Sequence, residues 1–128
     1  MTKNILFISM DDCAAYWDYR SVFKETLQTP NLDRICERAT VFRAAYCAAP
    51  LCGPSRATLM SGLAPHHSGV VSNDEYVFNH ISPKQMWSFD LKKHGYFCSS
   101  GGKIHHYFGA MNKKYHRVLY DDEPKSSV

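Results

Sequence analysis

A short apolar run near the start of the chain constrains the fold more than any other feature. Ile5-Leu6-Phe7-Ile8 stands inside the segment 4–9, and Asp11 and Asp12 follow closely. A run that is apolar on both faces is typical of a strand buried within a parallel sheet. We therefore predict a first strand over residues 4–9, with the two aspartates at its carboxyl end.

The next two predicted elements extend this pattern. The segment Thr29-Pro30-Asn31-Leu32-Asp33 has a capping residue, a proline at the first helical position and apolar residues at helical spacing, which predicts a helix ending near Arg38. Residues 41–46 are rich in strand-forming side chains. A strand, a helix and a strand in this order indicate an α/β fold, with a mostly parallel sheet flanked by helices.

The second half of the chain predicts two more helices and a third strand. Pro54 is placed to open a helix that ends at Gly62, and residues 83–94 form another helix. Residues 96–99 predict a strand. That strand delivers the loop 100–106 to the sheet edge where open α/β folds place their ligands.

Composition and charge exclude several classes of protein. With 128 residues, of which 45% are hydrophobic and 21% charged, the chain suits about one globular domain and not a fibre or a disordered tail. The net charge of +3 is scattered, so no footprint for nucleic acid or an anionic membrane emerges. The apolar run at the start is too short to span a membrane, and no signal-peptide cleavage site follows it. Five cysteines without an export signal favour reduced thiols, and we expect a cytoplasmic protein without nucleic-acid or membrane partners.

The most specific signal is the stretch Cys52-Gly53-Pro54-Ser55-Arg56, which leads into the predicted helix ending at Gly62. It resembles the signature of the sulfatase family, Cys-x-Pro-Ser-Arg followed by a helix that ends in glycine. The strand running into Asp11-Asp12, the helix start at 29–33 and Gly102-Lys103-Ile104-His105 match the family in order and approximate spacing. The resemblance therefore covers most of the chain.

The resemblance implies a fold and a domain plan. Members of the family have an alkaline phosphatase-like α/β domain, and residues 1–120 correspond to its N-terminal segment. Residues 121–128 are polar, and we predict a loose tail there. Because family members run to several hundred residues, we expect this chain to hold only the first part of the catalytic domain.

The resemblance also implies a chemistry. In the family the signature cysteine is oxidised after synthesis to formylglycine, whose aldehyde hydrates to a geminal diol. We expect this change at Cys52, made by a formylglycine-generating maturation enzyme, and a sulfate ester of a small molecule or a glycan as substrate. One diol oxygen attacks sulfur and the alcohol departs, and the second hydroxyl then expels sulfate and restores the aldehyde.

Asp11 and Asp12 are candidate metal ligands, because calcium and magnesium take carboxylate oxygens. Adjacent aspartates after a strand also commonly cap a turn, and the other motifs favour the metal. The thiol of Cys52 would be a poor ligand for a hard cation, whereas the oxygen of an aldehyde hydrate would suit one. We expect a divalent metal, Ca²⁺ first and Mg²⁺ as the alternative, on Asp11, Asp12 and the oxidised Cys52.

Three basic side chains complete the candidate site. Arg56 falls in the first turn of the Cys52 helix, where its guanidinium would hold the hydrate and neutralise charge. Lys103 and His105 alternate in a segment that we predict to be extended, so both would point to one side. The resemblance assigns Lys103 to the sulfate oxygens and His105 to the diol. A surface salt bridge for Arg56 and a solvated loop for the other two are the ordinary alternatives.

The remaining cysteines and histidines lack such a context. We assign the other cysteines to packing: Cys13, Cys36, Cys47 and Cys98. We place the other histidines on the surface or behind the site: His66, His67, His80, His94, His106 and His116.

Three functions stay open. The first is a sulfatase whose site is completed elsewhere, because the family adds a later metal pair, a leaving-group histidine and a second lysine that are not found in this sequence. The second is a phosphate or phosphonate monoester hydrolase of the same superfamily. The third is a truncated, non-catalytic remnant that self-associates through the open edge of its sheet. We expect the isolated 128-residue chain to be weakly active or inactive.

Overall fold

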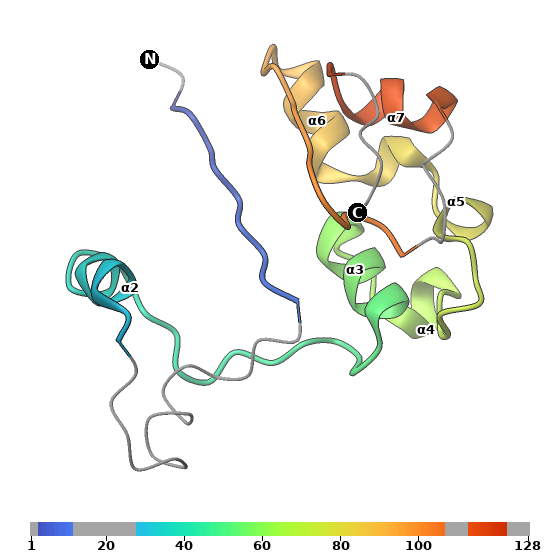
Figure 1. Ribbon diagram of the computed structural model, residues 1–128. Coiled ribbons are helices and arrows are strands. Elements are labelled where there is room, and N and C mark those ends of the chain that lie inside the picture. The colour runs from blue at the N-terminus through green and yellow to red at the C-terminus, as the bar shows by residue number, and fades with distance from the viewer. Residues whose placement is uncertain (1–2, 12–27, 107–112, 123–128) are drawn as a thin grey trace. The chain divides into compact units, whose positions relative to one another are not determined.

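The computed structural model describes residues 3–11, 28–106 and 113–122. It divides into two compact units, Met1–Ala45 and Tyr46–Val128 (Figure 1). Every regular element within these described ranges is a helix. None of the helices described is both long and apolar enough to cross a membrane.

The first unit holds one described helix, α2, which spans Pro30–Cys36. Proline suits the first helical position, because an amide N–H would have no helical partner there. The amide of Asp33 donates to the carbonyl of Thr29 at 2.9 Å, which closes the first turn. The predicted helix and its end near Arg38 are confirmed. Residues 3–10 run as an extended chain, drawn in blue in Figure 1.

The parallel sheet expected from the sequence is absent from the described part of the chain. Residues 4–9, 41–46 and 96–99 join no strand ladder, so the structure does not confirm the three predicted strands. A strand is defined by its hydrogen bonds to a neighbouring strand. A buried strand also needs side chains or helices that cover both of its faces. The first segment has no such cover, since Leu6 is 84% and Ile8 74% exposed.

In the second unit, α3 spans Cys52–Ser61 and carries the signature. It begins two residues before the predicted start at Pro54 and ends where predicted. Gly62 follows the helix with a φ of 73°, a left-handed conformation that costs glycine little because it has no Cβ. The buried face of α3 consists of Gly53, Pro54, Ala57 and Met60.

The helix predicted over residues 83–94 is divided in two. η1, Pro83–Gln85, is a 3₁₀ turn that opens with a capping box at Ser82, and α6 covers Trp87–Lys93. Met86 lies between them with an extended backbone and a fully buried side chain. The break therefore places Met86 in the core instead of on a continuous helical face.

The described residues of the second unit form three more helices that the sequence analysis did not predict. α4 and α5 are single turns, Pro65–Ser68 and Val77–His80, and α7 covers Lys113–Leu119. α3 packs on α4 and α6, and α6 packs on α7. Ile81 and Leu119 are at most 1% exposed, and each buried aliphatic side chain of this size contributes roughly 1.5–3 kcal/mol. The second unit thus has a core of its own.

The predicted loose tail does not begin at residue 121. The amide of Cys98 donates to Oδ2 of Asp121 at 2.7 Å, and the hydroxyl of Ser99 donates to Oδ2 of Asp122 at 2.7 Å. The prediction is wrong for these two aspartates, because their partners lie more than twenty residues away in sequence and cannot be seen in a local pattern. Residues 123–128 lie outside the described residues.

Candidate functional site

Cys52 is the first residue of α3 and so lies at the N-terminus of the helix that carries the signature. Its side chain is half-buried and forms no disulfide. The amide of Gly53 donates to Oδ1 of Asn73 at 2.8 Å, so the segment around residue 73 lies against the start of the helix. A Cβ on Gly53 would lie 3.1 Å from the carbonyl oxygen of Ser72, so a larger residue would require residues 72–73 to move slightly. Asn73 and Gly53 therefore fix the turn that presents Cys52, and sequence reasoning missed Asn73.

Arg56 links α3 to the segment that contains Lys103 and His105. Its guanidinium Nη1 donates to the carbonyl oxygen of Lys103. Arg56 is half-buried and lies on the first turn after Cys52. The structure therefore brings residue 103, which is distant in sequence, against Arg56 on the helix that begins at Cys52.

His105 is buried, with 8% of its surface exposed. Its ring packs against Phe78 of α5, with 5.1 Å between ring centroids. Burial, and then the nearby charge of Arg56, lower the pKa of His105 to about 4, so the ring is neutral at pH 7. Neither ring nitrogen has a hydrogen-bond partner among the described residues. A neutral imidazole can accept a hydrogen bond at one nitrogen and donate one at the other.

Lys103 has a different environment from His105. The segment bends at Gly102 and again at Ile104 and His105, and Lys103 is exposed. The expectation of an extended segment, with both side chains on one side, is therefore not met. The roles assigned to the two residues stay predictions.

The predicted metal ligands are divided between the units. Asp11 is exposed and lies in the first unit, whereas Cys52 lies in the second; Asp12 is outside the described residues. No group of three or more His, Cys, Asp or Glu side chains within the described ranges could hold a metal ion. The donor chemistry nevertheless fits a hard cation, because the exposed Asp11 offers carboxylate oxygens and an oxidised Cys52 would add another oxygen.

The other predicted cysteines and histidines have mixed outcomes. Cys98 is buried as expected, whereas Cys47 is exposed and its assignment to packing is wrong. His116 is 3% exposed, which excludes a place on the surface and leaves the alternative, a place behind the site. Cys13 lies outside the described residues.

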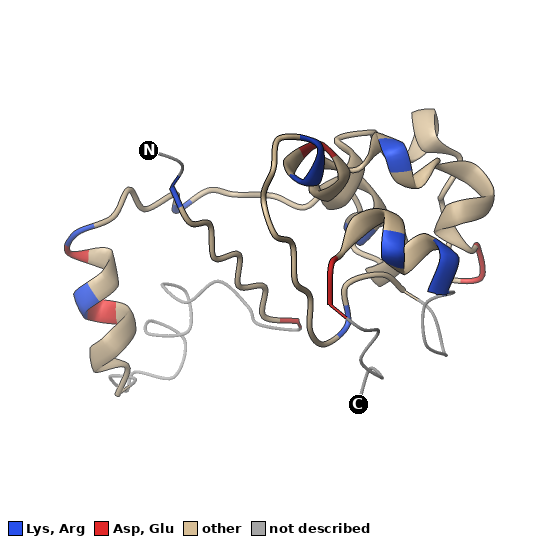
Figure 2. Cartoon of the chain, turned by 90° about the horizontal axis from the view of Figure 1, so that it is seen from above, with Lys and Arg blue, Asp and Glu red and all other residues tan. Residues whose placement is uncertain are grey.

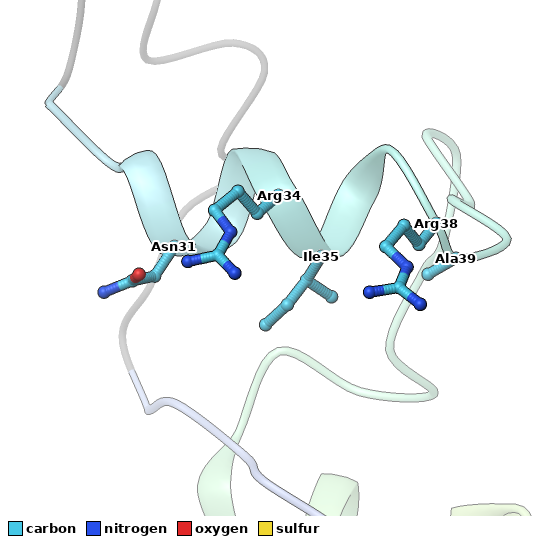
Figure 3. A pocket seen from close by; sticks show the side chains of 5 residues that line it. All are labelled: Asn31, Arg34, Ile35, Arg38 and Ala39. Atoms are coloured by element: carbon cyan, nitrogen blue, oxygen red, sulfur yellow. The ribbon is translucent and has the colours of Figure 1, made fainter.

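The first unit also has a shallow hollow on α2 that the sequence analysis did not identify. Figure 3 shows that Arg34 and Arg38 extend from the helix on the same side as Ile35. Figure 2 shows Lys and Arg on several helices, among them α2 and α6. The hollow is lined by Asn31, Arg34, Ile35, Arg38 and Ala39.

The comparison with protein families identifies the chain. The profile of the sulfatase family matches residues 3–125. This chain belongs to the sulfatase family. The family implies an alkaline phosphatase-like α/β fold and, for its full-length members, hydrolysis of sulfuric esters.

Individual sulfatases show the same relationship. A sulfatase of Formosa agariphila is 35% identical over 109 residues, which are 80% of this chain and 21% of the relative. Human N-acetylgalactosamine-6-sulfatase is 35% identical over 113 residues, with the same shares of the two chains. Human arylsulfatase D is 34% identical over 110 residues, 80% of this chain and 18% of the relative. The chain thus spans about a fifth of the length of these relatives. No solved structure gives a significant match.

Proposed function

We propose that this sulfatase-family chain supplies the nucleophile segment of a formylglycine-dependent sulfuric ester hydrolase. The proposal rests on the position of Cys-Gly-Pro-Ser-Arg at the start of α3. Arg56 of this sequence donates a hydrogen bond to the backbone carbonyl of Lys103. Oxidation of Cys52 to formylglycine would supply a diol with a nucleophilic hydroxyl. The half-buried position of Cys52 leaves that group within reach of an ester.

The chain's own residues would bind and orient the reactants. The positive end of the α3 dipole favours negative charge, which suits a sulfate group beside residue 52. Arg56 adds a permanent positive charge, and Lys103 would hold the sulfate oxygens from the exposed side of the segment. The neutral ring of His105 would accept a hydrogen bond from a hydroxyl of the diol.

A divalent cation, Ca²⁺ or Mg²⁺, would be held by Asp11, Asp12 and the oxidised Cys52. It would polarise the bound oxygens and offset charge. Carboxylates are hard ligands, so the donor set suits such an ion. The remaining ligands of the ion would come from water or from other parts of the protein.

We infer the substrate class from the relatives' names. By their names, N-acetylgalactosamine-6-sulfatase acts on a sulfated sugar and choline-sulfatase of Rhizobium meliloti, 32% identical over 79 residues, acts on the sulfate of a small molecule. A sulfate ester of a glycan or a small molecule is therefore the proposed substrate. The further proposed partner is a formylglycine-generating maturation enzyme, and the proposed location is the cytoplasm.

Peptide mass spectrometry of protein from its native host tests the modification. The peptide containing Cys52 should carry the aldehyde mass, and Cys98 in the same sample serves as the control that should keep its thiol. Intact thiol alone at Cys52 would refute the proposal.

A substrate panel tests the reaction. A full-length enzyme that contains this segment, matured with the modifying enzyme, should hydrolyse aryl sulfates, and Cys52→Ala in that enzyme should abolish turnover while retaining the fold. Faster hydrolysis of phosphate or phosphonate monoesters than of sulfates would instead assign the related hydrolase activity. Absence of turnover with every ester would favour a non-catalytic role.

A further inference from the structure

Asp121 connects the end of α7 to the backbone of residue 98. Its Oδ2 accepts from the amide of Cys98 at 2.7 Å, and its own amide donates to the carbonyl of Cys98 at 2.7 Å. Nζ of Lys92 lies 3.0 Å from Oδ1 of Asp121. The Cys98 amide, and then Lys92, hold the pKa of Asp121 below its usual value. Asp121 is therefore an ionised acceptor at neutral pH.

Asp122 holds the next two residues of the same segment. Its Oδ2 accepts from the hydroxyl of Ser99 at 2.7 Å and from the amide of Ser100 at 3.2 Å. Nε2 of the buried His116 lies 3.9 Å from its Oδ1. Burial would raise the pKa of Asp122, but these two hydrogen bonds and the nearby His116 outweigh it and lower the pKa. The side chains of Asp121 and Asp122 thus accept hydrogen bonds from three consecutive residues, 98 to 100.

Residues 98–100 lead directly into the segment that we propose to bind substrate. Gly101 and Gly102 follow Ser100 and are exposed, and a Cβ on either would meet nothing within 4 Å. Among the described residues, the Cβ side of both glycines is therefore open. Beyond them, the carbonyl of Lys103 accepts from Arg56. Lys103 thus lies between residues 98–100, which Asp121 and Asp122 hold, and its own hydrogen bond to Arg56.

We propose that Asp121 and Asp122 are positioning residues for Lys103 and His105, acting as a clamp on residues 98–100. The proposal deepens the proposed function, on which the roles of Lys103 and His105 rest. Both carboxylates already accept from backbone or hydroxyl donors, which suits a clamp. Neither aspartate belongs to the sulfatase signature quoted above.

Hydrogen exchange in the whole protein tests the clamp without reference to catalysis. Asp122→Ala should make amides of residues 98–106 exchange about ten-fold faster or more, because charge-assisted hydrogen bonds are lost locally. Ser99→Ala removes one partner from the other side and should give a smaller increase in the same residues. Asp74→Ala, at an exposed aspartate outside the clamp, is the matched control and should leave exchange unchanged.

Activity of the matured enzyme gives the second measurement. Asp122→Ala should lower kcat/KM for a sulfate ester about ten-fold, and Asp122→Asn, which keeps one acceptor oxygen, should recover part of it. Exchange at residues 98–106 equal to that of the Asp74→Ala control would overturn the clamp. An equal rise throughout α3 to α7 would overturn it too, because that would show general destabilisation. If the full-length matured enzyme hydrolyses no sulfate ester, the proposed function fails, while hydrogen exchange still decides whether the clamp exists.

Discussion

The two units of this chain contain similar apolar residues but differ in what they bury. In the first unit α2 has no buried residue, and Ile5, Leu6 and Ile8 are each at least 60% exposed. In the second unit Met86 and Leu119 are fully buried. A high content of apolar residues is therefore not sufficient to form a buried core.

The difference follows from the kind of partner each element needs. Short helices such as α3, α6 and α7 bury one face each, and they find that cover in neighbouring helices of the same unit. A strand that is apolar on both faces needs a paired strand at its edge and layers above and below. The segment 4–9 has no such neighbours among the described residues, so its apolar side chains stay exposed.

The largest expected effect is at the centre of the second unit. Leu119→Ala should lower the free energy of unfolding by about 2–5 kcal/mol, since it leaves a cavity at a side chain with no exposure. Leu6→Ala, at an 84% exposed side chain of the first unit, should change it by less than about 0.5 kcal/mol. Denaturant titration measures both. Equal losses of unfolding free energy in the two variants would contradict the difference between the units, because they would show that Leu6 is covered in solution.

The second largest effect is the pH dependence caused by burial of His105. Its pKa is about 4 in the folded protein, below the ordinary value near 6.5, so protonation favours the unfolded state. Stability should therefore fall as pH drops from about 6.5 towards 4, by about 3 kcal/mol at pH 4 from this residue.

His105→Gln isolates that contribution from the other groups that titrate in acid. The difference in unfolding free energy between wild type and variant should shift by this amount between pH 7 and pH 4. His66→Gln, at an exposed histidine, is the control and should show no such shift. If the difference in unfolding free energy between wild type and His105→Gln did not change with pH, the ring of His105 would be solvated. That result would contradict its burial in the second unit.

A smaller effect is expected from the turn at Cys52. Gly53→Ala should destabilise the second unit by about 1–3 kcal/mol, because the new Cβ would lie 3.1 Å from the Ser72 carbonyl oxygen and 3.2 Å from Oδ1 of Asn73. Gly101→Ala is the matched control, since a Cβ there meets nothing within 4 Å. Thermal melting of both variants provides the test, and similar melting temperatures would show that the contact with residues 72–73 is not tight.

The smallest effect is expected on α2. Ile35→Ser should change stability by less than about 0.5 kcal/mol, because Ile35 is 60% exposed and α2 buries nothing. A loss above about 1 kcal/mol in denaturant titration would contradict the exposure of α2. Such a loss would show that the first unit also buries apolar surface in solution.

Several local features could be predicted from the sequence because short-range chemistry decides them. Pro30 at the first position of α2 and Gly62 after α3 set helix ends through their own backbone preferences. The signature from Cys52 to Arg56 was sufficient to suggest the family, which the family match then confirmed. α7 was missed, although Tyr115, Val118 and Leu119 have helical spacing, which was the available signal.

Short-range chemistry in the sequence was thus enough to predict the start of α2, the end of α3 and the family of this protein. Only the tertiary structure decided that Met86 interrupts a helix to reach the core, that His105 is buried and neutral, and that Asp121 and Asp122 hold residues 98–100. The first group depends on residues a few positions apart, whose conformations are limited by sterics and local hydrogen bonds. The second depends on burial and on partners more than twenty residues away, which no local pattern specifies.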